Sequence, residues 1–318
     1  MRRLSAFDAL GRGLANVRGN LELVAVVAGG SILVVAVVLA TMIPWLGFDA
    51  ADISSWLAAR GEGAEIGDLA ALARRVFEVF SDLGAFLLAL ILGLTAGSLV
   101  VSWYLGGVLG VLVAGDAQAP GGPGRRALLF RTWSWRFFVG ESNRLTWRVL
   151  LYYSLFLTLT SIAMLVLVLL VVAASLVATK SGVAAGLALG CGGSLPLLFV
   201  FFALVLALSM GQGDLVRAES GVVAAFRAGF GVVGRRLGAA IGIFAVVFLA
   251  SIALGIFQAV LTFVLGLALA ARPFLSMTVQ VVIFLLQLLA GGWLNLVLYA
   301  AFIALLRSER ALEAAPAA

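Results

Sequence analysis

Residues 149–179 read VLLYYSLFLTLTSIAMLVLVLLVVAASLVAT, a stretch without a single acidic or basic side chain. A helix that crosses the roughly 30 Å hydrocarbon core of a bilayer needs about 20 mostly apolar residues. The stretch is long enough for one tilted span and too short for two spans joined by a turn. It therefore predicts one transmembrane helix.

Five further uncharged stretches predict five more such helices. The composition agrees, because 64% of the 318 residues are apolar and 11% are charged, against about 45 to 50% and about 25% in soluble domains. We expect an all-α, polytopic membrane protein whose six transmembrane helices form a single membrane domain, residues 1–318. The predicted helices cover residues 23–47, 84–113, 149–176, 183–212, 238–268 and 274–306.

Two pairs of predicted helices are separated by one charged residue each, Lys180 and Arg272. The neighbouring Ser181-Gly182 and Pro273 supply turn chemistry, and proline suits the first turn of a helix, so both pairs should be tight hairpins. The glycines and the proline between Gly190 and Pro196 leave open a re-entrant segment in the fourth helix.

The distribution of Lys and Arg predicts the orientation. With six spans, both termini share one side with the connections at residues 116–148 and 214–236. That side carries 16 basic residues and the other side carries 5, so the positive-inside rule predicts cytoplasmic termini, N-in and C-in. The excess of Arg over Lys and the many Ala, Gly and Val residues are typical of a GC-rich bacterial genome, which indicates the bacterial cytoplasmic (inner) membrane.

The predicted outer connection, residues 49–82, holds seven acidic residues against three arginines. Apolar residues recur at helical spacing within it, which predicts an amphipathic helix across the outer ends of the bundle. Such a helix serves as a cap, or alternatively as a lid or a docking surface.

Arginine alternates with aromatic residues in the predicted cytoplasmic segment 125–148. This composition is typical of a helix in the lipid headgroup region, where aromatic rings lie at the interface and guanidinium groups meet phosphate. The interpretations left open are a structural belt, specific contact with anionic lipid, and a soluble partner; the position beside a span argues against nucleic acid. The candidate residues are Arg125, Arg126, Arg131, Trp133, Trp135 and Arg136.

Short Ala-Phe-x-Ala segments precede the first and fifth predicted helices, at residues 6–9 and 225–228. Each leads through basic residues into a span, which adds Arg227, Arg235 and Arg236 to the candidate lipid-binding or partner-binding residues. Together with segment 125–148, they give every odd-numbered span a cytoplasmic amphipathic lead-in and suggest three helix hairpins of one plan.

This plan of six spans and Ala-aromatic-x-Ala lead-ins resembles the bacterial membrane domain that is fused to some glycerophosphodiester phosphodiesterases. The resemblance implies a multi-span membrane module concerned with lipids. The chain has no histidine, whereas the phosphodiesterase domain uses histidines, so the resemblance implies no catalysis here and no site residue.

Two patterns inside the spans predict helix contacts. Gln280, Gln287 and Asn295 lie on one face of the sixth helix, and this polar seam should point into the bundle, with Gln258 of the fifth helix as a partner. The polar seam should form interhelical hydrogen bonds or, alternatively, line a path or pocket for a polar or lipid headgroup. Small residues at every fourth position predict packing seams at Ser98, Ser102, Gly106 and Gly110, at Gly182, Gly186, Gly190 and Ser194, and at Gly234, Gly238 and Gly242.

The chemistry that the sequence lacks restricts its function. There is no histidine, one cysteine and no Walker A motif, and no acid or base lies in the middle of a predicted span, which disfavours metal sites, cofactors, nucleotide hydrolysis and ion-coupled pumping. Carboxylates at the membrane edge, such as Glu141 and Asp214, should be solvated. We expect no enzyme, but a protein that organises membrane lipids or a membrane partner; the alternative is a permease-like subunit that works with a separate ATPase or as a homodimer.

Overall fold

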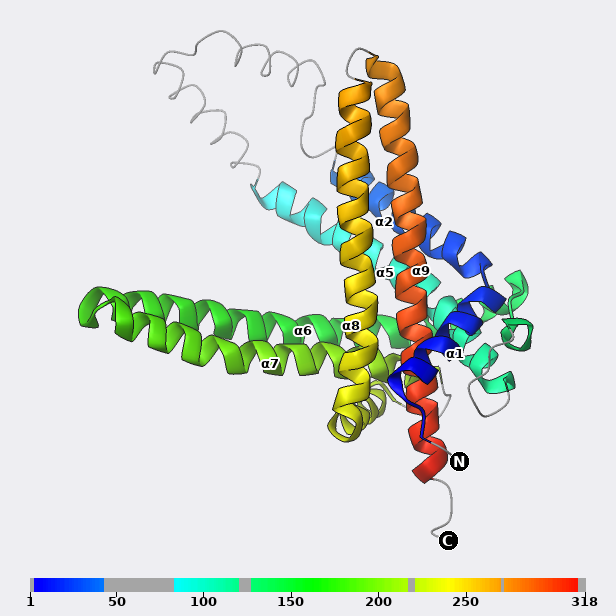
Figure 1. The fold of residues 1–318 in the computed structure, drawn as a ribbon, viewed down its shortest axis with the longest axis horizontal. Helices are drawn as coiled ribbons and strands as arrows, with labels where there is room; N and C mark the ends of the chain where they lie inside the picture. Colours follow the sequence, from blue (N-terminus) through cyan, green and yellow to red (C-terminus); the bar gives the residue numbers. More distant parts are fainter. Residues whose placement is uncertain (1–2, 43–82, 120–126, 217–220, 270–271, 314–318) are drawn as a thin grey trace. The chain divides into compact units, whose positions relative to one another are not determined.

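The computed structural model describes residues 3–42, 83–119, 127–216, 221–269 and 272–313 (Figure 1). Within these ranges there are helices and no strands, and six helices are long and apolar enough to cross a membrane. The all-α, polytopic fold predicted from the sequence is therefore confirmed. The helices are α1 (Ala6–Gly19), α2 (Glu22–Met42), α5 (Leu83–Gln118), α6 (Trp135–Ser181), α7 (Val183–Leu215), α8 (Val222–Ala268) and α9 (Pro273–Glu313), with a 3₁₀ turn η2 (Ala127–Phe130).

Two predicted features lie outside the described residues. They are the amphipathic helix of the acidic connection 49–82 and the first two arginines of segment 125–148, Arg125 and Arg126.

The lead-in before the third span belongs to the same helix as the span itself. α6 begins at Trp135 and continues for 47 residues. Ser134 caps its start, because the Ser134 hydroxyl accepts a hydrogen bond from the backbone N–H of Phe137. At 1.5 Å per residue this is about 70 Å, roughly twice the hydrocarbon core. The charged first turns of α6 therefore have room to extend beyond the apolar part of a bilayer.

α8 is also 47 residues long, but it contains a kink. Arg236 has non-helical backbone angles, φ −135° and ψ 33°, which divide an amphipathic segment from the apolar length that follows. The lead-in before the fifth span is therefore a separate helical rod that can lie at its own angle.

The turn between α6 and α7 is a single residue. Gly182 has φ +94°, a left-handed conformation that other residues rarely adopt, and helix runs on both sides of it. α7 then continues without interruption past Gly190 and contains Pro196 in its interior. The fourth span is thus a continuous helix, and the re-entrant alternative is wrong.

The chain folds into two compact units, Gly29–Val101 and the remainder. In the unit Gly29–Val101, α2 and α5 pack closely through glycine. A Cβ atom on Gly93 would overlap the Thr41 hydroxyl, and one on Gly97 would lie 3.3 Å from a methyl group of Val38. No charged residue occurs in the described part of this unit.

The larger unit has its core where α1, α7, α8 and α9 meet. Its fully buried side chains include Met210, Ile243 and Phe302. α6 packs on α7 and α8 packs on α9, so each pair forms an antiparallel hairpin (Figure 1).

Glycines permit several of these contacts, as the predicted seams required. A Cβ on Gly106 would lie 3.1 Å from the Leu145 Cβ of α6, and one on Gly186 would overlap Ala178. The third seam is wrong in part, because Gly234 and Gly238 have nothing within 4 Å of a Cβ, and only Gly242 meets a neighbour, Ala6.

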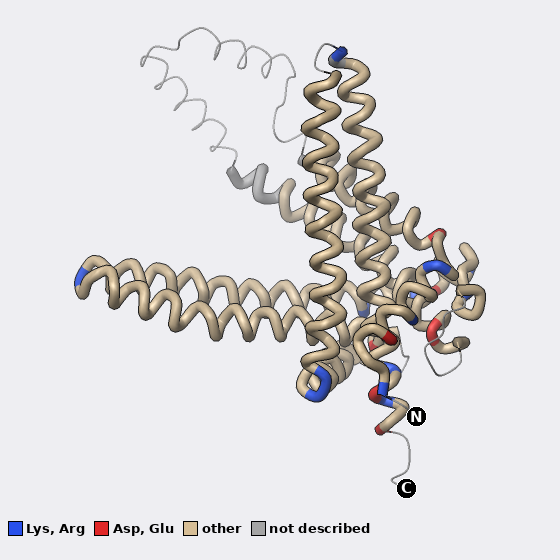
Figure 2. The backbone as a smooth tube through the Cα atoms, viewed as in Figure 1, with Lys and Arg blue, Asp and Glu red and all other residues tan. Residues whose placement is uncertain are grey.

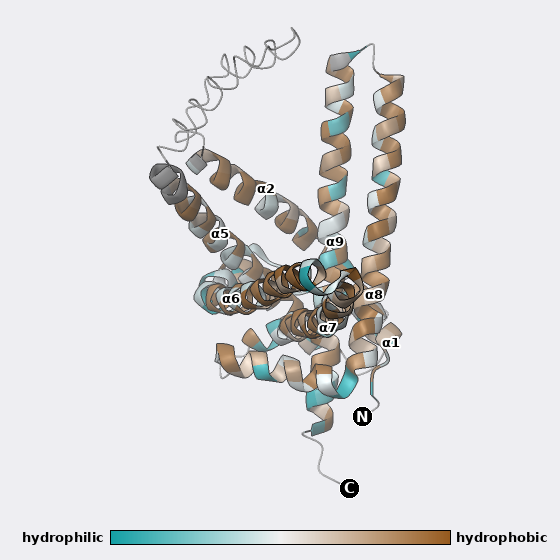
Figure 3. Ribbon diagram, turned by 90° about the vertical axis from the view of Figure 1, so that its left-hand side faces the viewer, coloured by the Kyte–Doolittle hydropathy of each residue, from teal (hydrophilic) through white to brown (hydrophobic). Residues whose placement is uncertain are grey.

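Most residues along the hairpins are hydrophobic (Figure 3). Exposed large residues run along all four helices; examples are Leu169, Phe199, Phe257 and Phe284. Such continuous apolar surface is unstable in water and suits lipid tails.

Candidate functional site

The charged residues of the larger unit gather at one end of its hairpins (Figure 2). Within the described residues, Lys180 at the end of α6 and Arg272 before α9 are the charges at the opposite ends of the hairpins. We call the end at which the charged residues gather the charged base. An uncharged length with a charged end is the arrangement expected of hairpins that lie in lipid and have one end in water. The candidate lipid-binding or partner-binding residues that the structure describes belong to that base, whereas the polar seam lies within α8 and α9.

A buried ion cluster joins α1, α5 and α9 in the base. The Arg12 Nε lies 2.5 Å from the Asp116 Oδ1, and the two side chains are only 4% and 1% exposed. Arg307 of α9 contacts the other carboxylate oxygen at 3.1 Å. Arg12 also lies over the Phe130 ring, 5.4 Å from its centroid, so the charge is balanced by a carboxylate and an aromatic face.

One buried amide fixes the start of the Arg/Trp segment, by which we mean the described residues 127–148, against this cluster. The Asn20 Oδ1 accepts hydrogen bonds from the backbone N–H groups of Thr132, at 3.0 Å, and Trp133, at 2.9 Å. Its Nδ2 donates to the carbonyl of Phe130 at 2.7 Å. Asn20 is fully buried, so residues 130–133 are held by a side chain that water does not reach.

The Arg/Trp segment presents aromatic and basic side chains on its surface. Trp133 and Trp135 pack on the buried Phe138 at centroid distances of 5.3 and 5.7 Å. Trp135 is nevertheless 62% exposed and Trp147 66% exposed, and Arg136 is exposed between them in sequence. We call the exposed residues Leu128, Leu129, Arg131, Trp135, Arg136 and Trp147 the Arg/Trp belt.

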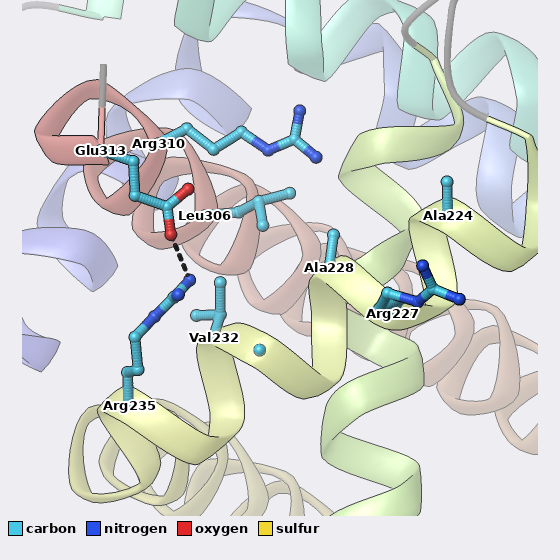
Figure 4. Close-up of a pocket in the computed structure, with 9 residues that line it drawn as sticks. Ala224, Arg227, Ala228, Val232, Arg235, Leu306, Arg310 and Glu313 are labelled. Atoms are coloured by element: carbon cyan, nitrogen blue, oxygen red, sulfur yellow. Dashed lines mark ion pairs between the residues drawn. The ribbon is translucent and has the colours of Figure 1, made fainter.

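The lead-in of α8 and the last turns of α9 line an open pocket of about 670 Å³ (Figure 4). Arg227 and Arg235 come from α8, while Arg310 and Glu313 come from α9. The Arg235 guanidinium pairs with the Glu313 carboxylate at 2.6 Å. Apolar wall is supplied by Ala224, Ala228, Val232 and Leu306.

Two further carboxylates hold α9 in place behind this pocket. Asp214, at the end of α7, is 1% exposed and binds Arg310. Glu309 is also buried and lies 3.3 Å from Arg236, the residue at the kink of α8. Arg236 additionally donates a hydrogen bond to the Leu4 carbonyl, so the kink is linked to the start of the chain.

Sequence reasoning found the arginines of the base but missed their partners. Asp214 was expected to be solvated, and this is wrong, because its carboxylate is buried against an arginine. Asp116 and Glu309 were not singled out at all. Their only signal is that each lies near the end of an apolar helix, where most carboxylates are hydrated.

The predicted polar seam of the sixth span does not face the interior. Gln280, Gln287 and Asn295 are exposed on α9, and Gln258 of α8 is half-buried. The helices α1, α7 and α8 contact α9, and the core that they share includes other α9 residues, among them Ala301 and Phe302.

The described carboxylates therefore serve mainly as counter-ions of arginine, and no group of three or more metal-binding side chains occurs among the described residues. What the base offers is arginine beside aromatic and aliphatic surface, a chemistry suited to phosphate groups next to lipid tails. Comparisons with protein-family models, curated proteins and solved structures find no match to this chain.

Proposed function

We propose that this chain is a non-catalytic, multi-pass protein of the bacterial inner membrane, with both termini cytoplasmic, that organises anionic lipids around its charged base. The observation that carries the proposal is the Arg/Trp belt, in which Trp135, Arg136 and Trp147 are exposed at the start of a helix that continues as an apolar span. Tryptophan prefers the headgroup level, and each arginine near an anionic surface contributes about 1 kcal/mol.

The way the belt is held supports the same proposal. A flexible basic loop would reach lipid equally well, yet here Asn20, Phe138 and Arg12 contact residues 130–133 and hold them in one place. Preorganisation lowers the entropy that binding costs, which is useful for retaining particular lipids.

Lipid retention tests the proposal. The full chain is purified from bacterial membranes in a mild detergent, and the lipids that remain bound are quantified by mass spectrometry. Arg136→Gln should lower the ratio of phosphatidylglycerol and cardiolipin to phosphatidylethanolamine about fivefold, the equivalent of about 1 kcal/mol. Arg272→Gln, at the other end of the hairpins, is the matched control and should leave the ratio unchanged. Equal ratios in wild type and both variants would reject the proposal.

A further inference from the structure

The pocket between α8 and α9 contains more positive charge than its structural contacts use. Three arginines and one glutamate line it. Arg310 is balanced by Asp214 and Arg235 by Glu313. Arg227 is exposed and has no ion pair within the part of the chain that the structure describes. One positive charge on this wall is therefore available to an anion.

The paired arginines can still donate hydrogen bonds into the pocket. A guanidinium group has five N–H donors, and the ion pairs of Arg235 and Arg310 each involve one terminal nitrogen. In Figure 4, Arg235 with Glu313 lies on one side of the pocket and Arg227 lies on the other, with its guanidinium group directed away from Arg235. A planar guanidinium group presents its N–H donors in a fork that matches the oxygens of a phosphate.

The size and the apolar wall of the pocket restrict the ligand further. A volume of about 670 Å³ lies within the usual range for small-molecule sites and far exceeds the space that inorganic phosphate fills. Val232 and Leu306 supply apolar surface next to the arginines. The ligand should therefore carry carbon as well as phosphate.

We infer that this pocket binds the phosphate group of an organic phosphate ester, with Arg227 as the main ligand and Arg235 and Arg310 as additional donors. Two sources fit this chemistry, a phospholipid headgroup and a soluble glycerol phosphate. If the source is a lipid, the inference deepens the proposed lipid-binding function and rests on it. The pocket and the Arg/Trp belt use different residues, so each can be tested separately.

Two binding measurements on the full chain distinguish the sources. One titrates glycerol 3-phosphate into protein held in phosphatidylcholine nanodiscs and follows it by ³¹P NMR. The other measures uptake of phosphatidic acid into such nanodiscs by native mass spectrometry. In whichever measurement the wild type binds, Arg227→Gln should weaken binding about tenfold, as expected for a charge-assisted hydrogen-bonding group. Arg272→Gln, at the other end of the hairpins and outside both the pocket and the belt, is the matched control and should retain the wild-type affinity.

A second variant tests the site by shape instead of charge. Ala224 lines the pocket and is exposed, so Ala224→Trp should fill the entrance, preserve the thermal unfolding temperature and weaken binding as strongly as Arg227→Gln. Loss in the phosphatidic acid measurement alone assigns a lipid, and loss with glycerol 3-phosphate alone assigns a soluble ester.

The inference is overturned if the wild type binds neither compound, or if Arg227→Gln and Ala224→Trp bind as well as Arg272→Gln. In that case a reduced lipid ratio in Arg136→Gln would still uphold the belt. Conversely, pocket binding together with an unchanged lipid ratio in Arg136→Gln would reject the belt and retain the pocket.

Discussion

Arg12 and Asp116 are separated by 104 residues in the sequence and form a salt bridge of 2.5 Å that is almost completely buried. The bridge joins α1, which precedes the first span, to the end of α5. Arg307 near the end of α9 contacts the same carboxylate and its backbone carbonyl. Three distant segments of the chain therefore meet at one side chain, Asp116.

Replacing Asp116 with Asn should strongly destabilise the protein. The change removes the Asp116 charge from its buried ion pair with Arg12, and breaking a buried pair in this way costs about 3–5 kcal/mol. The free energy of unfolding, measured by denaturant titration in detergent micelles, checks this value. Glu22→Gln is the matched control, because it breaks an exposed pair with Arg131 and should cost less than about 1 kcal/mol. Similar losses in the two variants would contradict the burial of the Arg12 cluster.

Two glycines of α1 should respond oppositely to alanine. A Cβ on Gly13 would lie 2.7 Å from the Ala301 nitrogen and 2.9 Å from the Val297 carbonyl oxygen of α9, both backbone atoms that cannot move aside cheaply. Gly13→Ala should therefore lower stability by about 1–3 kcal/mol. Gly11 has nothing within 4 Å, so Gly11→Ala should raise stability by up to about 1 kcal/mol through helix propensity. Thermal unfolding in detergent compares them, and a stabilised Gly13→Ala variant would show that α1 does not pack on α9 in this way.

Asn20→Ala should release the Arg/Trp belt from its support. The change leaves the backbone N–H groups of Thr132 and Trp133 without their acceptor, so we expect a loss of about 2 kcal/mol or more and faster trypsin cleavage after Arg131. Asn143→Ala is the control, because this exposed amide accepts one bond, from the Trp103 indole, and should change neither quantity much. Unchanged cleavage in Asn20→Ala would mean that the amide does not hold the segment.

The sequence predicted the helices well because their signal is local. A run without charge, such as residues 149–179, reports a span by its length alone, and the single glycine at the end of α6 reports the turn. The glycine seams at Gly106 and Gly186 were also predictable, because helical spacing places small residues on one face.

The contacts of the base could not be predicted in this way. Asp116 and Arg307 meet because α5 and α9 end at the same place, and no local pattern encodes that distance. The polar seam failed for a related reason: the period shows that Gln280, Gln287 and Asn295 share a face, but only the neighbouring helices decide which face is covered. Local chemistry thus identified the arginines, whereas tertiary packing selected their partners.

The orientation of the charged base is a prediction that cysteine labelling can check. The native Cys191 is exposed on α7, so the experiment uses a Cys191→Ala background with one new cysteine at a time. Arg3→Cys lies before α1, at the base, whereas Ser181→Cys lies at the α6–α7 turn, and both positions are exposed. Because arginine-rich segments are retained in the cytoplasm, a membrane-impermeant maleimide should label Ser181→Cys in spheroplasts and should label Arg3→Cys only after the membrane is permeabilised. The reverse pattern would place the Arg/Trp belt and the α8–α9 pocket on the outer face, and a cytoplasmic phosphate ester could then not be the ligand.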